Sequence, residues 1–297
     1  MTELSKKIFD SWQVRKTRAQ KTAFIDFMKS ECPDLKVEEG GFGKNRNLIL
    51  GDPGTAKVIV GAHYDTCAAL PFPNLITPKN ILFYIFYNLL LLAPMLALIA
   101  VFFKTANVIF YFLGLGYTIA LSAIMLLGKP NRHTANDNTS GVIALVELYA
   151  TLSDEERKKV ALVFFDNEEN GLLGSRFYRQ RHKSAIKEQL MINLDCISDG
   201  DYIIVIKSKT AEALHGKLID STFVSNDEKT VIQALSSNTI YPSDQANFPN
   251  HVAISALKKN KLIGYYLDKI HTKADVNFDE KNIEIISEGV KDLISKI

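Results

Sequence analysis

The chain has 297 residues, 47% of them hydrophobic, which is enough to bury the core of one large α/β domain. Its formal net charge of +2 at pH 7 is too small to indicate nucleic acid as the main partner. The three cysteines, Cys32, Cys67 and Cys196, show neither paired nor metal-ribbon spacing, which argues against a disulfide framework and favours a reducing compartment.

The N-terminal segment predicts a helix over residues 4–31, which ends before Pro33. Basic residues between Lys6 and Lys21 alternate with apolar ones at roughly helical spacing, so we interpret them as the solvated face of an amphipathic helix. The stretch has no apolar core of the kind that a secretory signal needs. We therefore expect the globular part of the chain in the cytosol.

Three strands are predicted next. Residues 35–39 and 47–51 form two of them around a Gly40-Gly41 turn. Residues 57–65, "KVIVGAHYD", form a third strand that is buried.

Two continuous apolar runs follow, at residues 81–103 and 108–128. About 20 residues of helix cross a bilayer core, so each run is long enough to span. Neither run shows the polar stripe that a core helix of this size should have. We therefore predict that residues 80–128 form a transmembrane helical hairpin; a pair of core helices, a hydrophobic cap or a dimer surface are the alternatives.

The charges around the hairpin predict its orientation. Its flanks carry Lys79, Lys129 and Arg132, whereas its turn carries only Lys104. Positive charge favours the cytoplasmic side, so we expect a two-span protein of the cell membrane with both flanks in the cytoplasm. Residues 1–79 and 129–297 then form one discontinuous globular domain.

The rest of the chain alternates between helices and strands. Helices are predicted at 140–152, from about 174, at 208–218 and at 283–297. Strands are predicted at 160–165, 191–195, 202–206 and 252–257. This alternation predicts an α/β fold, a three-layer αβα sandwich with a mostly parallel central sheet.

Acidic and imidazole side chains collect where these strands end, which is where open α/β sheets bind ligands. The strand ends supply His63, Asp65, Glu168, Glu169 and Asp195, and two loops add Asp137 and His271. Such a set of nitrogen and oxygen ligands suits zinc, and suits manganese or cobalt less well.

Each of these residues also has an ordinary interpretation. An isolated buried histidine is more often a hydrogen-bonded core residue than a ligand, and Asp137 is well placed to cap the next helix. The ordered set favours a metal site instead, because burying so many carboxylates without cations would cost several kcal/mol.

The motifs "HYD", "NDNTSG", "EENGLLGS", "NLD" and "IHTKAD", in that order, resemble the co-catalytic zinc aminopeptidases related to aminopeptidase Y and the bacterial leucyl aminopeptidases. The resemblance covers nearly all of the chain outside the hairpin. It implies two zinc ions per chain and a specific role for each of seven residues. His63 and Asp195 would bind one zinc, His271 and Glu169 the other, and Asp137 both; Glu168 would be the general base, and Asp65 would orient His63.

The adjacent carboxylates of Glu168 and Glu169 fit that assignment. Neighbouring side chains in a strand point to opposite faces, so the pair can serve one site only where the chain leaves the sheet, as Asn170-Gly171 indicates. Glu169 can then hold metal while Glu168 accepts a proton from water and passes it to the leaving amine.

The expected substrate is a peptide with a free N-terminus, since acidic groups around the site favour an α-amino group. The hairpin is inserted between His63 and Asp137, which places the site near the bilayer and suggests short peptides close to the membrane. Besides the bilayer at residues 81–128, an oligomeric partner is compatible with the sequence.

Three other functions stay open. A glutaminyl cyclase of the same fold would use one zinc and a similar pair of glutamates. A carboxypeptidase or dipeptidase would need a basic group such as Arg176 or Arg179 facing the substrate carboxylate. A membrane-tethered receptor or scaffold is disfavoured because a binding module has no need of the intact Glu168.

Overall fold

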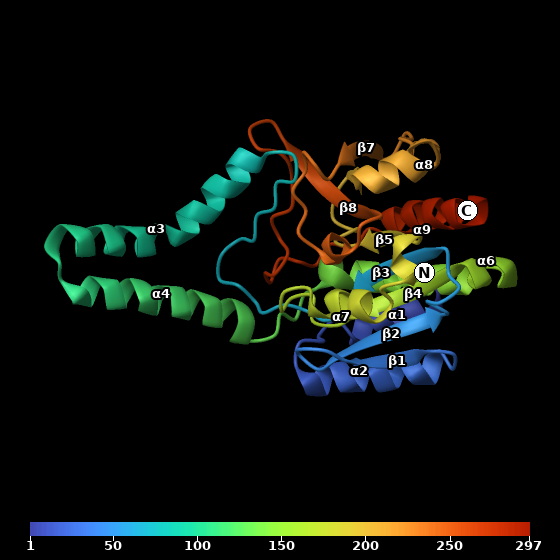
Figure 1. The fold of residues 1–297 in the computed structure, drawn as a ribbon, viewed down its shortest axis with the longest axis horizontal. Helices are drawn as coiled ribbons and strands as arrows, with labels where there is room; N and C mark the ends of the chain where they lie inside the picture. Colours follow the sequence, from blue (N-terminus) through green and yellow to red (C-terminus); the bar gives the residue numbers. More distant parts are fainter.

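A computed structural model describes residues 1–297. Nine strands form one sheet in the order β1-β2-β4-β3-β5-β8-β6-β7, with β9 paired to β8 (Figure 1). The strands are β1 Lys36–Gly40, β2 Asn45–Gly51, β3 Val58–His63, β4 Val160–Phe165, β5 Leu190–Leu194, β6 Tyr202–Lys207, β7 Thr230–Leu235, β8 His251–Asn260 and β9 Gly264–Tyr266.

The central strands β4, β3, β5 and β8 run parallel to one another. His63 at the end of β3 pairs with Phe165 at the end of β4, so both strands stop at the same level. Parallel neighbours end at one edge of the sheet, and the chain therefore leaves β3, β4 and β5 on the same side of the molecule.

Helices cover both faces of this sheet. They are α1 Glu3–Ser11, α2 Arg18–Glu31, α5 Gly141–Thr151, α6 Asp154–Lys159, α7 Leu173–Arg181, α8 Lys209–Thr222 and α9 Glu280–Lys296. The larger core packs α1, α2, α5, α8 and α9 against one face, and α7 packs against the other. Successive strand residues alternate between the two cores: Leu48 and Leu50 join the first and Ile49 the second. The predicted α/β sandwich with a mostly parallel centre is confirmed.

The prediction of one continuous helix over residues 4–31 is wrong. Thr17 starts a new helix, because its side chain accepts from the amide of Gln20 and the Gln20 side chain bonds back to the Thr17 amide. The linker before it carries Arg15, which is fully buried and donates to the carbonyl of Tyr64 at 2.5 Å. The helix is thus interrupted between Ser11 and Arg18, and the guanidinium of Arg15 in this linker is buried in the interior.

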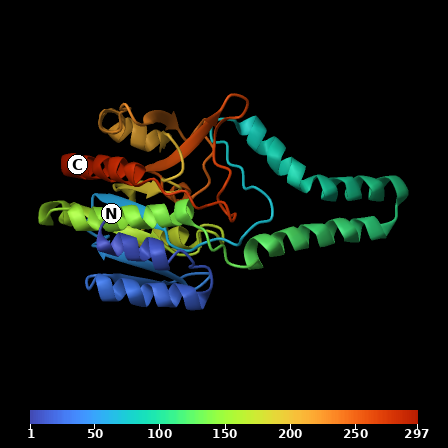
Figure 2. The same ribbon diagram turned by 180° about the vertical axis from the view of Figure 1, so that it is seen from behind.

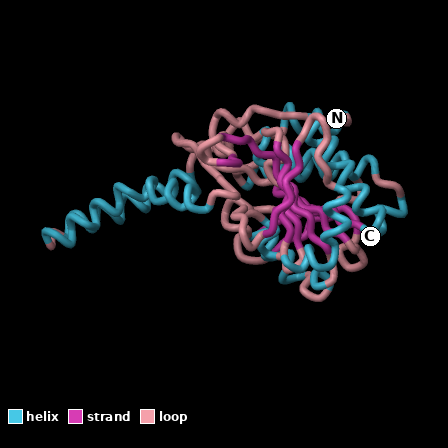
Figure 3. Tube along the Cα trace, turned by 90° about the horizontal axis from the view of Figure 1, so that it is seen from above, coloured by secondary structure: helices cyan, strands magenta, loops and turns pink.

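Two apolar helices, α3 Ile81–Thr105 and α4 Val108–Leu127, project together from the sandwich (Figures 1 and 2). No residue of α3 is buried and only Gly114 of α4 is, so the alternative of a pair of core helices is wrong. Both are long and apolar enough to cross a membrane. Figure 3 shows them from above as a single arm, and Figure 1 shows α3 bent near its middle, where Pro94 lies in the sequence.

Candidate metal centre

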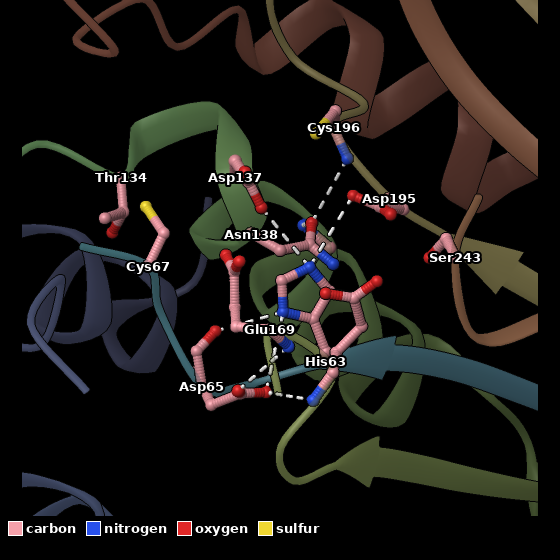
Figure 4. A network of polar contacts seen from close by, with 12 residues as sticks. His63, Asp65, Cys67, Thr134, Asp137, Asn138, Glu169, Asp195, Cys196 and Ser243 are labelled. Atoms are coloured by element: carbon pink, nitrogen blue, oxygen red, sulfur yellow. Dashed lines mark hydrogen bonds and ion pairs between the residues drawn. The ribbon is translucent and has the colours of Figure 1, made fainter. Parts of the chain in front are cut away.

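The seven residues singled out from the sequence lie together at the edge where β3, β4 and β5 end. His63 is the last residue of β3, Asp195 follows β5, and Glu168 and Glu169 lie in the turn after β4. A cavity of about 170 Å³ is lined by all of the predicted metal ligands and by Glu168. Figure 4 shows His63, Asp137, Glu169 and Asp195 pointing toward one another from four separate segments.

The two oxygens of Asp137 face two different imidazole rings. Oδ1 lies 3.3 Å from Nε2 of His63, and Oδ2 lies 3.0 Å from Nε2 of His271. Asp195 adds an oxygen 3.7 Å from the His63 nitrogen, and Glu169 adds one 3.3 Å from the His271 nitrogen. Candidate ligand atoms form three groups, each within 4.8 Å. Two of them share Asp137, one with His63 and Asp195 and the other with Glu169, His271 and Cys67, and the third joins His63 to Glu168 and Glu169.

Charge and hydrogen bonding at the site fit a metal. Oδ1 of Asp195 and Oε1 of Glu169 are buried without a hydrogen-bond partner, which is costly unless a cation faces them. Burial by itself lowers the pKa of His63 and of His271, but the surrounding carboxylates outweigh it and raise both pKa values well above 6.5. Without metal the two rings therefore hold protons where neutral imidazoles would bind zinc.

Asp65 connects the His63 strand to the Glu168 turn. Its carboxylate accepts hydrogen bonds from the backbone amides of Glu168 at 2.9 Å and Glu169 at 3.2 Å. Toward His63 it presents its backbone carbonyl, 3.0 Å from Nδ1, and a carboxylate oxygen at 3.7 Å. One residue therefore fixes the ring of a candidate ligand and the position of the two glutamates.

The turn after β4 carries Glu168 away from the sheet. The Glu168 carbonyl accepts from the amides of Gly171 and Leu172, and Gly171 adopts a φ of 94° that favours glycine. Burial raises the pKa of Glu168 well above its ordinary value, and the carboxylates of Glu169 and Asp244 add to the effect. Such a carboxyl group is suited to accept and release a proton near neutral pH.

Asp275 is a site residue that we missed, although it ends the quoted motif "IHTKAD". Its carboxylate accepts from the backbone amides of Asn136 at 2.9 Å and Asp137 at 3.0 Å. Burial, with the nearby Asp137 charge, raises its pKa to about 8. Asp275 thereby fixes the backbone of Asp137, the candidate ligand shared by the two groups.

Two basic residues beneath the site were also missed, because we assigned them to a solvated helix face. That interpretation is wrong for Arg15 and Lys21, which are both buried. Lys21 pairs with Asp166 at 2.5 Å, and Arg15 donates to the hydroxyl of Thr139 at 3.2 Å. Their spacing in the sequence gives no sign of this, since they contact segments more than a hundred residues away.

The thiol of Cys67 lies in the group formed by Asp137, Glu169 and His271. Burial raises its pKa well above the ordinary value, and the neighbouring carboxylates raise it further. The other two cysteines are also buried, and none of the three forms a disulfide.

Comparison with known proteins identifies the family to which the chain belongs. Residues 117–292 match the model of peptidase family M28. The chain belongs to peptidase family M28. It is therefore a metallopeptidase, and the resemblance to the zinc aminopeptidases is confirmed. No curated protein matches the chain by sequence.

Solved structures share the fold at low sequence identity. The LapA aminopeptidase of Legionella pneumophila is 11% identical, with a TM-score of 0.60 over 99% of this chain and 69% of its own. The glutaminyl cyclase of Macrostomum lignano is 13% identical, with a TM-score of 0.59 over 99% of this chain and 88% of its own. Because both share the fold, the fold does not decide between their activities.

Proposed function

We propose that this chain is a membrane-anchored zinc aminopeptidase that binds two zinc ions. The observation that carries the proposal is the position of Asp137, whose two oxygens face His63 and His271. A carboxylate shared between two ligand groups is the arrangement that a two-metal hydrolase needs. His63 and Asp195 would hold one ion, and Glu169 and His271 the other.

Zinc held there supplies Lewis-acid chemistry: it polarises a peptide carbonyl and makes water a better nucleophile at neutral pH. Glu168 supplies the proton transfers. Its carboxylate takes the proton from the attacking water and then gives it to the nitrogen of the departing peptide. Asp65 holds the backbone of Glu168 while both transfers occur.

The charge of the cavity favours an N-terminal over a C-terminal substrate. No lysine or arginine lines it. Arg176 and Arg179, the candidates for binding a substrate carboxylate, line a separate hollow with Lys183 and Lys187. A substrate carboxylate would therefore find no cationic side chain in the cavity, which favours a substrate bound by its N-terminal end.

Glutaminyl cyclisation is the second candidate, supported by the similarity in fold to the Macrostomum lignano enzyme. A cyclase of the kind considered from the sequence would hold one metal, whereas the shared Asp137 favours two.

The test is a substrate panel with the detergent-purified full chain. The panel comprises aminoacyl anilides, the same peptides blocked at the N-terminus, and a peptide with N-terminal glutamine. The proposal predicts hydrolysis of free N-termini only, lost on chelation and restored by zinc. Pyroglutamate formation without hydrolysis would move the assignment to the cyclase.

For the membrane part, we propose that residues 80–128 are a transmembrane unit inserted into a catalytic unit of residues 1–79 and 129–297. Exposed apolar side chains along the hairpin support this, with Leu82 82% and Phe103 78% exposed. Such a surface is stable in lipid and costly in water.

Basic residues at the foot of the hairpin support a cytoplasmic catalytic unit. Lys16 donates to the carbonyl of Leu126 at the end of α4 at 2.7 Å. The β8–β9 turn carries Lys261 and the 89% exposed Leu262, and the adjacent Ile263 carbonyl accepts from Asn80 at the start of α3. Positive charge and an apolar tip suit an anionic inner leaflet.

Cysteine labelling tests this topology. The native cysteines are buried, so a Thr105→Cys variant carries one accessible thiol at the hairpin turn. We expect an impermeant reagent to label it from outside intact cells and to leave a Lys209→Cys control on the catalytic unit unlabelled. The reverse pattern would overturn the orientation.

A further inference from the structure

The hairpin forms part of the catalytic cavity. Tyr84, in the first turn of α3, lines the cavity together with Asn74 and Ile76 from the segment that leads into the helix. Tyr241, Pro242 and Ile270 complete this side. One side of the cavity is therefore acidic and built by the catalytic unit, and the other is largely apolar and partly built by the membrane insertion.

Backbone hydrogen bonds fix the leading segment against a candidate metal ligand. The amide of Leu70 donates to the carbonyl of His271 at 2.7 Å. Further along, Ile76 and Leu267 exchange two hydrogen bonds of 3.0 and 2.9 Å. The segment thus runs beside the His271 loop as an added strand-like piece.

Hydrogen bonds to neighbouring segments also fix the start of α3. The carbonyl of Pro78 accepts from the amide of Ile240, next to Tyr241, at 3.0 Å. Asn80 caps the helix by accepting from the amide of Phe83, and its side-chain NH₂ donates to the carbonyl of Ile263 at 3.3 Å. The hydroxyl of Tyr87 donates to the carbonyl of Pro73. The first turn of the hairpin therefore has a defined position at the cavity.

The apolar side rests on buried hydrophobic residues. Ile76 packs against the cluster that contains Tyr241, Leu267 and Ile270. Ile76, Tyr84, Tyr241 and Ile270 therefore offer a hydrophobic contact surface to a substrate in the cavity, opposite the carboxylates.

We infer that Tyr84 and Ile76 are specificity-determining residues, which make the enzyme select peptides whose first side chain is large and apolar. The inference rests on the aminopeptidase activity proposed above. The α-amino group of the substrate would face the carboxylates, and its first side chain would lie against the ring of Tyr84. A substrate in the cavity therefore touches the membrane insertion itself.

The test compares Tyr84→Ala with wild type, using the full chain in detergent and leucyl, phenylalanyl and alanyl anilides. One apolar contact discriminates by about 10- to 200-fold. We expect kcat/KM for the leucyl and phenylalanyl substrates to fall by at least about 10-fold, with the alanyl value changed by less than about 3-fold. Tyr84→Phe keeps the ring and should keep the selectivity.

Tyr111→Ala on α4 is the matched control, because Tyr111 is 46% exposed on the hairpin and does not line the cavity. It should leave the leucyl-to-alanyl ratio unchanged. If Tyr84→Ala left the leucyl-to-alanyl ratio of kcat/KM unchanged, or lowered kcat/KM equally for every substrate, the inference would be wrong and the proposed function would stand. Failure of the wild type to hydrolyse any free N-terminal peptide would instead overturn the proposed function, and the inference with it.

Discussion

The carboxylate of Asp65 accepts a hydrogen bond from the backbone amide of Glu168 at 2.9 Å. Asp65, two residues after the end of β3, thus holds the turn after the neighbouring strand β4, which carries Glu168, the proposed general base. An asparagine at 65 would keep one acceptor but place an NH₂ group against the second amide of the turn. We predict that Asp65→Asn lowers kcat/KM by about 10- to 100-fold when the enzyme is assayed at saturating zinc.

Asp52→Asn provides the control for that variant. The Asp52 carboxylate also accepts from a backbone amide, that of Gly54 at 2.9 Å, but in an exposed turn far from the site. If both variants lowered kcat/KM equally, Asp65 would have no positioning role.

Asp275 should control zinc affinity through the backbone of Asp137. Removing its carboxylate leaves two buried amides without acceptors and frees the loop that carries the shared ligand. We predict that Asp275→Ala weakens zinc binding by about 10- to 100-fold, measured by competition with a chelator. Asp279→Ala, which removes a helix cap on α9 instead, should bind zinc as wild type does. Wild-type zinc affinity in Asp275→Ala would contradict this role.

Zinc affinity should rise with pH. The pKa values of His63 and His271 are both raised in the metal-free site, so both rings are protonated at neutral pH. Zinc binds neutral imidazole and must displace these protons, so lowering the pH favours the metal-free form. Titration calorimetry in buffers of different ionisation enthalpy should show proton release between about pH 6 and pH 8. Zinc binding without proton uptake by the buffer would be inconsistent with the site as described.

Arg15 should contribute to folding stability. Its guanidinium donates to the carbonyls of Trp12 and Tyr64 and to the hydroxyl of Thr139, and a lysine cannot reach all three. We predict that Arg15→Lys lowers the free energy of unfolding by about 1–3 kcal/mol, measured by urea titration in mild detergent. The exposed Arg179→Lys should be neutral; an equally neutral Arg15→Lys would refute the prediction.

Much of the fold was predictable because local patterns determine it. The strand at Val160–Phe165 has the predicted bounds, since a continuous apolar run between turn residues has few alternatives. The hairpin helices begin at the predicted residues for the same reason. The strand at Thr230–Leu235 was not predicted, because its half-buried residues show no clear alternation.

The candidate site shows where such patterns fail. His63 ends a buried strand, and Glu168 and Asp195 follow two others within three residues, so their convergence was predictable from the rule for strand ends. Arg15 acts through the carbonyl of Tyr64, 49 positions along the chain, and Asp275 through the amide of Asp137, 138 positions away. Local periodicity carries no information about such contacts, and the apolar side that Tyr84 adds to the cavity depends on tertiary structure in the same way.

The most direct test of the central claim is zinc content and peptide hydrolysis measured together in Glu168→Gln. Glutamine keeps the shape of the side chain but cannot accept the proton of the attacking water. We predict the same zinc content as wild type and a turnover of leucyl anilide lower by about 10²- to 10⁴-fold. Hydrolysis at the wild-type rate by the zinc-loaded variant would show that Glu168 is not the general base and would contradict the mechanism.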